Sequence, residues 1–291
     1  MAQADSGRAL VVGGDSLVGS ALQEHCRKMG MAVDATSRRP GAGLPFDLSD
    51  PDFAPLGRAD YRMAFLCAAV TSMQACQQDP DGSRRINVEN TLALARRLAD
   101  RGVHMVFLSS SQVFDGETPA PAEDAPRAPK NEYGRQKLAV EEAIAREDLP
   151  AAILRPTKVL ADRPVGVFKG WFEALSQGRK AQAATNMALS PVMVADVAEA
   201  AWRLAEARHR GIWHTGSSDA IGYFDAARLM AEKRHLPLDL VEGQDVTEAQ
   251  VPSIFRHRYV TIGCDKIGRS LGLPAKRARD ILDALFEGFP R

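Results

Sequence analysis

The segment "NEYGRQK" places a tyrosine and a lysine four residues apart, Tyr133 and Lys137. On a helix this spacing sets both side chains on one face, one turn apart. A free tyrosine has a pKa of about 10 and is a poor acid–base group at neutral pH. A nearby ammonium group favours the phenolate and lowers that pKa. The pair therefore predicts a proton-donating tyrosine tuned by a lysine, and the lysine can also hold the ribose of a nicotinamide cofactor.

Three serines, Ser109, Ser110 and Ser111, end the strand-like run that precedes this helix. At the carboxyl end of a strand, one of these hydroxyl groups can orient a substrate carbonyl. A serine, Tyr133 and Lys137 would then polarise and protonate that carbonyl together. A Y-x-x-x-K pair alone is common by chance. A pair that follows a serine-ended strand in a βαβ chain is a much more specific indication of a catalytic site.

The segment "ALVVGGDSLVGSAL" (9–22) predicts a strand, a glycine turn and the start of a helix. Gly13 and Gly19 fit the outer places of a G-x-x-G-x-x-G spacing, and Ser16 holds the middle place. A helix N-terminus offers unpaired N–H groups and a positive dipole end to a phosphate. The segment is therefore either a dinucleotide phosphate loop or an ordinary strand–turn–helix. In the first case the expected cofactor contacts are Gly13, Asp15, Ser16, Leu17, Val18 and Gly19.

The second strand-like run ends in "TSRRPG", with Ser37, Arg38 and Arg39 where an NAD-binding site would place an acid for the ribose hydroxyls. An acid there repels a 2′-phosphate, whereas an arginine pairs with it. The residues therefore favour NADPH, with NADH as a second cofactor, unless both arginines are solvated loop charges. The segment "FDLSD" (46–50), which contains Asp47 and Leu48, is expected to pass the adenine.

Apolar and amphipathic runs alternate along the first half of the chain, which predicts an α/β fold. The order favours a Rossmann-type, doubly wound parallel sheet covered on both faces, with ligands at the carboxyl ends of its strands. The expected strands are 8–12, 31–37, 63–69, 104–111 and 151–156, and the expected helices are 16–30, 86–102 and 133–147.

Beyond Pro156 the pattern loosens and predicts a smaller, mostly helical lobe for the substrate. Helices are expected at 165–178, 195–208, 222–235 and 275–289, and a strand at 211–216 is expected to return to the sheet. The predicted domains are a dinucleotide-binding domain at 1–156, joined by 191–216, and a substrate-binding lobe formed by 157–190 and 217–291.

Composition excludes several classes of function. The 37 basic and 37 acidic residues give zero net charge, which is not typical of a nucleic-acid or membrane surface. No apolar run is long enough to span a bilayer, and the polar start "MAQADSG" does not resemble a secretory signal, so we expect a cytoplasmic protein. The four cysteines form no C-x-x-C pair, and the six histidines show no ligand spacing, so no metal is expected.

The sequence resembles the extended short-chain dehydrogenase/reductases that act on sugar nucleotides, and it is most similar to their dTDP-4-dehydrorhamnose reductase-like branch. The resemblance covers about residues 1–216, and more faintly the rest, in motifs that include "GGDSLVGSAL", "RRINVENTLALA", "FLSSSQVFDG", "NEYGRQKLAVEEA" and "LSPVMVADVAEA". It implies that Ser110, Tyr133 and Lys137 are catalytic and that Asn87 flanks the site. It also implies that Ala68 and Ala69 touch the cofactor and that Pro156 lines the nicotinamide.

Departures from the family pattern concern the substrate pocket, for which Ser111, Gln112, Phe114 and Lys158 are the candidate residues. Dehydratase relatives carry an Asp-Glu pair where Ser111 and Gln112 stand, so 4,6-dehydration is not expected. Lys158, in "TKVLADRPVG", adds a charge where the family usually has an aromatic–glycine pair. Gln74 and Gln77 stand where acids are usual, which argues against a dimer or metal contact made by acids while leaving a homodimer open.

The resemblance implies an NADPH-dependent reductase of a carbonyl on a nucleotide-linked deoxysugar. A sugar-nucleotide epimerase on the same fold is the near alternative, because it needs the same Ser–Tyr–Lys set. A cofactor-binding regulatory subunit without turnover is the alternative from a different class, and the altered pocket around Lys158 is its support.

Overall fold

The computed structural model describes residues 7–57 and 59–289. Most of the amino-terminal stretch that bears on the secretory-signal prediction therefore lies outside the described residues. The chain divides into two compact units. The first comprises 7–114, Pro126–Arg155 and Ala195–Trp213, and the second comprises Asp115–Ala125, Pro156–Val194 and His214–289. The short segment Asp115–Ala125 thus groups with the second unit.

A seven-stranded sheet forms the centre of the first unit, in the order β11-β6-β5-β4-β1-β2-β3. Every pairing whose register is described is parallel, which confirms the predicted doubly wound α/β fold. The strands are β1 (Arg8–Val12), β2 (Val33–Ser37), β3 (Leu44–Pro45), β4 (Tyr61–Leu66), β5 (His104–Leu108), β6 (Ala151–Pro156) and β11 (Gly211–Thr215). Strands buried on both faces have continuous apolar sequences, and β5 is buried at every residue.

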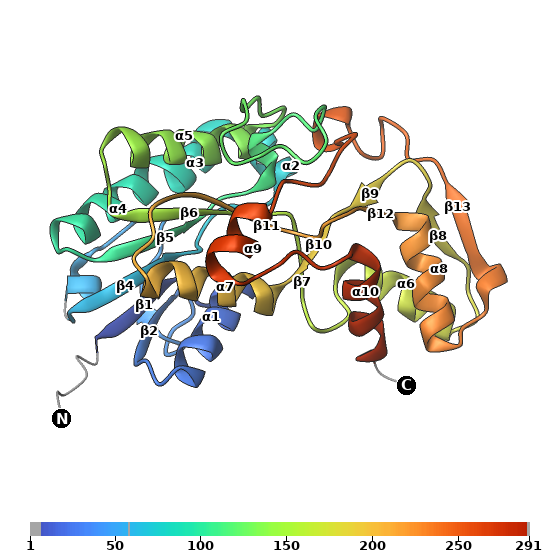
Figure 1. Cartoon of the computed structure of the whole chain (residues 1–291), viewed down its shortest axis with the longest axis horizontal. Helices are drawn as coiled ribbons and strands as arrows, with labels where there is room; N and C mark the ends of the chain where they lie inside the picture. The colour runs from blue at the N-terminus through green and yellow to red at the C-terminus, as the bar shows by residue number, and fades with distance from the viewer. Residues whose placement is uncertain (1–6, 58, 290–291) are drawn as a thin grey trace. The chain divides into compact units, whose positions relative to one another are not determined.

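Helices cover both faces of this sheet, with α3, α4 and α5 on one side and α1 and α7 on the other (Figure 1). Their bounds are α1 (Leu17–Lys28), α2 (Met73–Gln78), α3 (Pro80–Arg84), α4 (Thr91–Asp100), α5 (Glu132–Arg146) and α7 (Val194–Glu206). Val88, Leu92 and Ala95, which recur at helical spacing in the helix expected at 86–102, are buried. A π-helical turn at Arg85–Asn90 interrupts the expected continuous helix.

The second unit contains more strand than the sequence predicted. Three two-stranded sheets pair β7 (Lys158–Leu160) with β10 (Pro191–Met193), β9 (Ala188–Leu189) with β12 (Ile221–Gly222), and β8 (Ala181–Ala184) with β13 (Val241–Gln244). The helices are α6 (Gly166–Ser176), α8 (Tyr223–Arg234), α9 (Asp265–Leu271) and α10 (Ala278–Glu287). Strands of two to four residues are too short to show an alternating pattern in the sequence.

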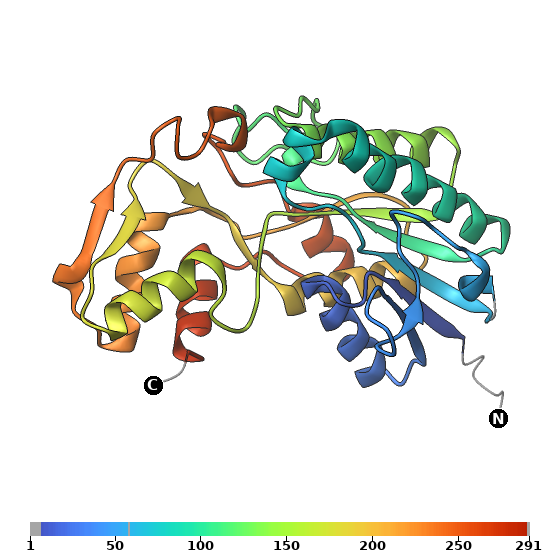
Figure 2. The ribbon, with the colours of Figure 1, turned by 180° about the vertical axis from the view of Figure 1, so that it is seen from behind.

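The second unit has its own apolar core. Helix α8 packs against β8 and β13, and α10 packs against α8, as Figure 2 shows from behind. Phe168, Trp171 and Phe286 meet there edge to face, with ring centroids 5.5 and 5.6 Å apart. In α10, which lies within the helix expected at 275–289, Ile281 and Leu282 are buried. Over 7–57 and 59–289, no helix is long and apolar enough to cross a membrane.

A buried ion pair joins α5 to β6 in the first unit. The Arg155 guanidinium donates from Nε to Glu141 Oε1 at 2.9 Å and from Nη2 to Glu141 Oε2 at 2.5 Å. Ser109 donates its hydroxyl to the same carboxylate. Arg155 is fully buried and Glu141 is 1% exposed. Because both charges are removed from water, each depends on the other for its stability.

We expect Glu141→Gln to destabilise the protein by about 3–5 kcal/mol, because it leaves the Arg155 charge buried without a counter-charge. Urea unfolding measures this change. The matched control is Glu142→Gln, since Glu142 is the exposed neighbour on the same helix. That control should stay within about 0.5 kcal/mol of the parent. Equal stabilities for the two variants would contradict the structural role of Glu141.

Candidate active site

The end of β5 and the start of α5 are docked against each other. Asn131 caps α5, because its Oδ1 accepts from the Gly134 backbone N–H at 2.9 Å. The Asn131 side chain also donates to Gln112 Oε1 at 2.9 Å. A Cβ on Gly134 would lie 2.1 Å from the Gln112 carbonyl oxygen, so a larger residue does not fit there. This packing holds the serine segment beside the first turn of α5.

Ser110, Tyr133 and Lys137 come together at this junction. The Ser110 side chain lies near the Tyr133 phenol and acts to lower its pKa. Lys137 Nζ donates to the Leu108 carbonyl oxygen at 2.7 Å and lies 5.7 Å from the centroid of the Tyr133 ring. The backbone at the end of β5 therefore fixes the ammonium group beside the phenol. The triad predicted from sequence thus has a common location in the first unit.

Burial dominates the protonation of this site. It raises the pKa of Tyr133 above its ordinary value, while the hydrogen bond from Ser110 opposes that rise. The sequence suggested that Lys137 would lower the Tyr133 pKa, but Ser110 is the group that does so in the structure. Burial also lowers the pKa of Lys137 to about 8, and the nearby negative charge of Glu141 opposes this fall. At neutral pH the site therefore holds a neutral phenol beside a mostly charged lysine.

The glycine turn after β1 packs closely against the neighbouring strands. Gly13 has φ +89°, and a Cβ there would lie 2.7 Å from the Ala68 backbone nitrogen. The Gly13 N–H donates to Thr36 Oγ1 at 2.8 Å. A Cβ on Gly19 would lie 2.2 Å from the Gly13 carbonyl oxygen, so α1 needs glycine to approach the turn. Both outer glycines are therefore required by the local geometry.

Ser16 occupies the middle place of the motif as the N-cap of α1. Its Oγ accepts from the Gly19 N–H at 3.0 Å and donates to the Gly13 carbonyl oxygen at 2.7 Å. Its backbone is extended, with φ −74° and ψ 161°, a conformation open to any residue. The hydroxyl that sequence analysis offered to a phosphate thus donates to Gly13 here. Leu17 and Val18 follow as the first residues of the helix.

The end of β2 is joined to the glycine turn through Asp15. Ser37 donates its hydroxyl to Asp15 Oδ2 at 2.6 Å, and Arg39 forms an ion pair with Asp15 Oδ1. The Arg39 backbone N–H in turn donates to Ser37 Oγ at 2.9 Å. Arg38 is exposed. The two arginines predicted to contact a 2′-phosphate therefore differ in their ion pairing, because Arg39 is held by Asp15 of the glycine turn and Arg38 is not.

The remaining predicted adenine contacts lie in the first unit. Asp47 Oδ1 accepts from the Ser49 N–H at 2.9 Å, and this bond lowers the Asp47 pKa. Leu48 is buried, and its carbonyl oxygen accepts from Asn90 Nδ2 at 2.8 Å. The side chain of Leu48 thus belongs to the apolar core.

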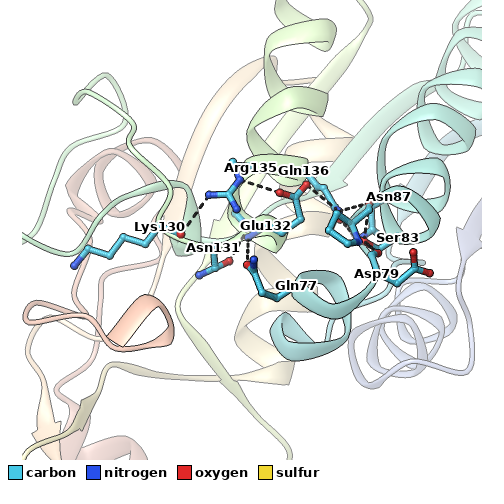
Figure 3. A network of polar contacts seen from close by, with 11 residues as sticks. Gln77, Asp79, Ser83, Asn87, Lys130, Asn131, Glu132, Arg135 and Gln136 are labelled. Carbon is cyan, nitrogen blue, oxygen red and sulfur yellow. Dashed lines mark hydrogen bonds and ion pairs between the residues drawn. The ribbon is translucent and has the colours of Figure 1, made fainter. Parts of the chain in front are cut away.

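Asn87 lies at the centre of a polar network, drawn in Figure 3. Its Oδ1 accepts from the Val70 N–H at 2.7 Å, and its Nδ2 donates to Gln136 Oε1 at 2.7 Å. Gln136 donates onward to Ser83 Oγ at 2.7 Å. Asn87 falls in the π-helical turn, and such turns are frequent at functional sites. The network ties the segment after β4, which carries Ala68 and Ala69, to the helix that carries Tyr133.

The other residues predicted to contact the substrate or the nicotinamide lie on different elements of the two units. Ser111 begins a short 3₁₀ turn that Ser110 caps. Phe114 is buried, and the Arg155 guanidinium lies 5.1 Å from its ring centroid. Pro156 and Lys158 fall in the second unit, where Lys158 is the exposed first residue of β7.

Sequence reasoning missed Asn131, Gln136, Glu141 and Arg155. The N-cap was detectable, because an asparagine precedes the helix by one residue. Glu141 follows Lys137 at helical spacing, and so it shares the buried face of α5. No sequence signal identifies Arg155 as its partner, because the two residues come from different elements.

Comparison with known proteins identifies a relative named as a reductase and another named as an enzyme subunit. The chain is 28% identical to the probable low-salt glycan biosynthesis reductase Agl14 of Haloferax volcanii, over 97% of this chain and 98% of that protein. It is also 28% identical to methionine adenosyltransferase 2 subunit beta of Pongo abelii, over 71% of this chain and 64% of that protein.

The same fold occurs in the solved structure of a dTDP-4-dehydrorhamnose reductase from Bacillus anthracis in complex with NADP. The TM-score is 0.83 at 19% sequence identity, over 97% of this chain and 98% of that one. The model of the RmlD substrate binding domain matches residues 7–289, almost the whole chain. The resemblance seen in the motifs is therefore confirmed, and the chain belongs to the RmlD substrate binding domain family.

Proposed function

We propose that the protein is an NADP(H)-dependent reductase of a carbonyl group on a nucleotide-linked deoxysugar. The observation that carries this proposal is the common location of the three side chains at the end of β5, where Lys137 is held by the Leu108 carbonyl oxygen 5.7 Å from the centroid of the Tyr133 ring and Ser110 acts on the Tyr133 phenol. Family membership and the reductase relative from Haloferax volcanii support the same reaction class.

The side chains have distinct tasks in this proposal. Ser110 donates a hydrogen bond that orients and polarises the substrate carbonyl oxygen. Tyr133, neutral at physiological pH because burial raises its pKa, gives its proton to that oxygen. The Lys137 ammonium stabilises the phenolate that remains, and the Leu108 carbonyl keeps it in place. Ser111 and Gln112 follow on the same segment and are the proposed substrate contacts. The bound nicotinamide supplies the hydride.

The residues of the first unit fit a dinucleotide. Gly13 leaves open a place where a side chain would meet the Ala68 backbone, and α1 begins directly after the turn. A phosphate at that helix N-terminus is favoured by the free N–H groups. The adenosine ribose of the cofactor then lies near Ser37, Arg38 and Arg39. The two arginines are cations that favour a 2′-phosphate on this ribose.

A regulatory subunit without turnover is the second candidate, and the match to methionine adenosyltransferase 2 subunit beta favours it. An epimerase remains the near alternative, because it needs the same three side chains. A fluorescence titration with NADPH and NADH, followed by a turnover screen over keto-sugar nucleotides, separates these functions. Cofactor binding without turnover across a broad panel supports the regulatory subunit.

We further propose a cytoplasmic location, which suits four unpaired cysteines, and we leave the homodimer as a prediction.

We expect Tyr133→Phe to bind NADPH like the parent and to lose about 10²–10⁴-fold in kcat, the usual worth of general acid–base catalysis. The control is Tyr61→Phe, which removes a hydroxyl that donates to Asp34 at 3.1 Å at the start of β4. Steady-state kinetics on the substrate found in the screen measure both. Parental kcat in Tyr133→Phe would show that another group donates the proton.

We expect Gly13→Val to abolish NADPH binding, because a branched side chain at φ +89° meets the Ala68 backbone and fills the phosphate place. Ser16→Gly should change NADPH affinity by less than about tenfold, since glycine replaces an N-cap serine at a cost of a few tenths of a kcal/mol. Fluorescence titration gives both affinities, and circular dichroism checks folding. A folded Gly13→Val that binds NADPH normally would mean that the turn holds no phosphate.

We expect the parent protein to bind NADPH more tightly than NADH. Replacing Arg38 and Arg39 together by alanine should weaken NADPH binding by about ten- to a hundredfold, because charge-assisted contacts to the 2′-phosphate are lost. NADH affinity should change little. If the parent binds the two cofactors equally, the arginines do not select the phosphate.

A further inference from the structure

Asp15, Ser37 and Arg39 form a closed hydrogen-bonded triangle at the end of β2. Asp15 accepts from Ser37 Oγ at 2.6 Å and from Arg39 Nε at 3.2 Å, and Arg39 N–H closes the triangle on Ser37 Oγ at 2.9 Å. The acid comes from the glycine turn, and its two partners come from the end of β2. The carboxylate thus stands beside the side chains proposed to receive the cofactor's 2′-phosphate.

The carboxylate is ionised under ordinary conditions. The hydrogen bond from Arg39, and then that from Ser37, holds the pKa of Asp15 below its usual value. The pair is open to solvent, since the side chain of Asp15 is 35% exposed and that of Arg39 is 73% exposed. An exposed ion pair of this kind contributes little to stability and opens easily. A ligand can therefore displace it without unfolding the turn.

We propose that Asp15 is the residue that limits the preference for NADPH and lets the same site accept NADH. The inference rests on the proposed function, because it requires a nicotinamide dinucleotide at this sheet edge. In parallel sheets of this type, an acid near the end of the second strand accepts hydrogen bonds from the ribose hydroxyls. Asp15 supplies such an acid from the turn, although Arg38 and Arg39 stand in its usual place.

Asp15 affects the binding of NADPH and the binding of NADH in opposite ways. A 2′-phosphate must draw Arg39 away from Asp15, and it also meets the repulsion of a second negative group nearby. A 2′-hydroxyl needs no cation and can donate to the carboxylate. Arg38, which is exposed, remains available to the phosphate in either case. Arg38 thus selects for the 2′-phosphate, and Asp15 selects against it.

The test is the pair of dissociation constants for NADPH and NADH, measured by fluorescence titration on the full chain. Asp15→Asn keeps the shape of the side chain and removes its charge. We expect NADPH affinity to rise by about two- to fivefold, the size of an exposed charge effect, with NADH affinity unchanged or lower. The matched control is Asp100→Asn, which removes an exposed carboxylate at the end of α4 and should leave both constants unchanged.

A double-mutant cycle tests whether the effect runs through Arg39. In an Arg39→Ala background, Asp15→Asn should raise NADPH affinity by less than in the parent, because no guanidinium is released. An unchanged ratio of the two affinities in Asp15→Asn overturns the inference, as does an equal change in Asp100→Asn. Failure of the parent to bind either cofactor overturns the proposed function instead, so the two failures are distinguishable.

Discussion

The buried ion pair between Glu141 and Arg155 ties together the elements that carry the site. Its carboxylate accepts from Arg155 on β6 and from Ser109 at the end of β5, while Glu141 itself belongs to α5. Because this charge lies out of water, moving any of the three elements away would remove a partner from a buried charged group, which is costly. The first turn of α5 is thereby held at the carboxyl edge of the sheet.

The chemistry of the site follows from that arrangement. With Ser109 bound to Glu141, its neighbour Ser110 is left to meet the Tyr133 hydroxyl. Lys137 lies one helical turn from each of Tyr133 and Glu141, and burial alone would drive it towards the neutral form. The negative charge of Glu141 opposes that effect. The same carboxylate therefore positions the serine segment and helps to keep the lysine charged.

The opposite end of the site is built differently. At the tip of β2 the charged groups are exposed, and Asp15 and Arg39 form a pair that water screens. Such a pair adjusts to its ligand, whereas the buried pair does not. In the proposed function, this difference gives a rigid setting to the proton donor and adjustable charges to the ribose end of the cofactor.

Local patterns were sufficient to predict much of this protein. The alternation of strands and helices in the first unit, the glycine turn at Gly13 and the shared face of Tyr133 and Lys137 all follow from spacing along the chain. The family resemblance singled out Ser110 among the three serines. Only the tertiary structure decided that Asp15 holds Arg39 and that short strands pair in the second unit. Those contacts join residues from separate elements, such as Arg155 and Glu141, 14 positions apart. Periodicity reports which face of an element is buried, but partners across elements are set by how the whole chain packs.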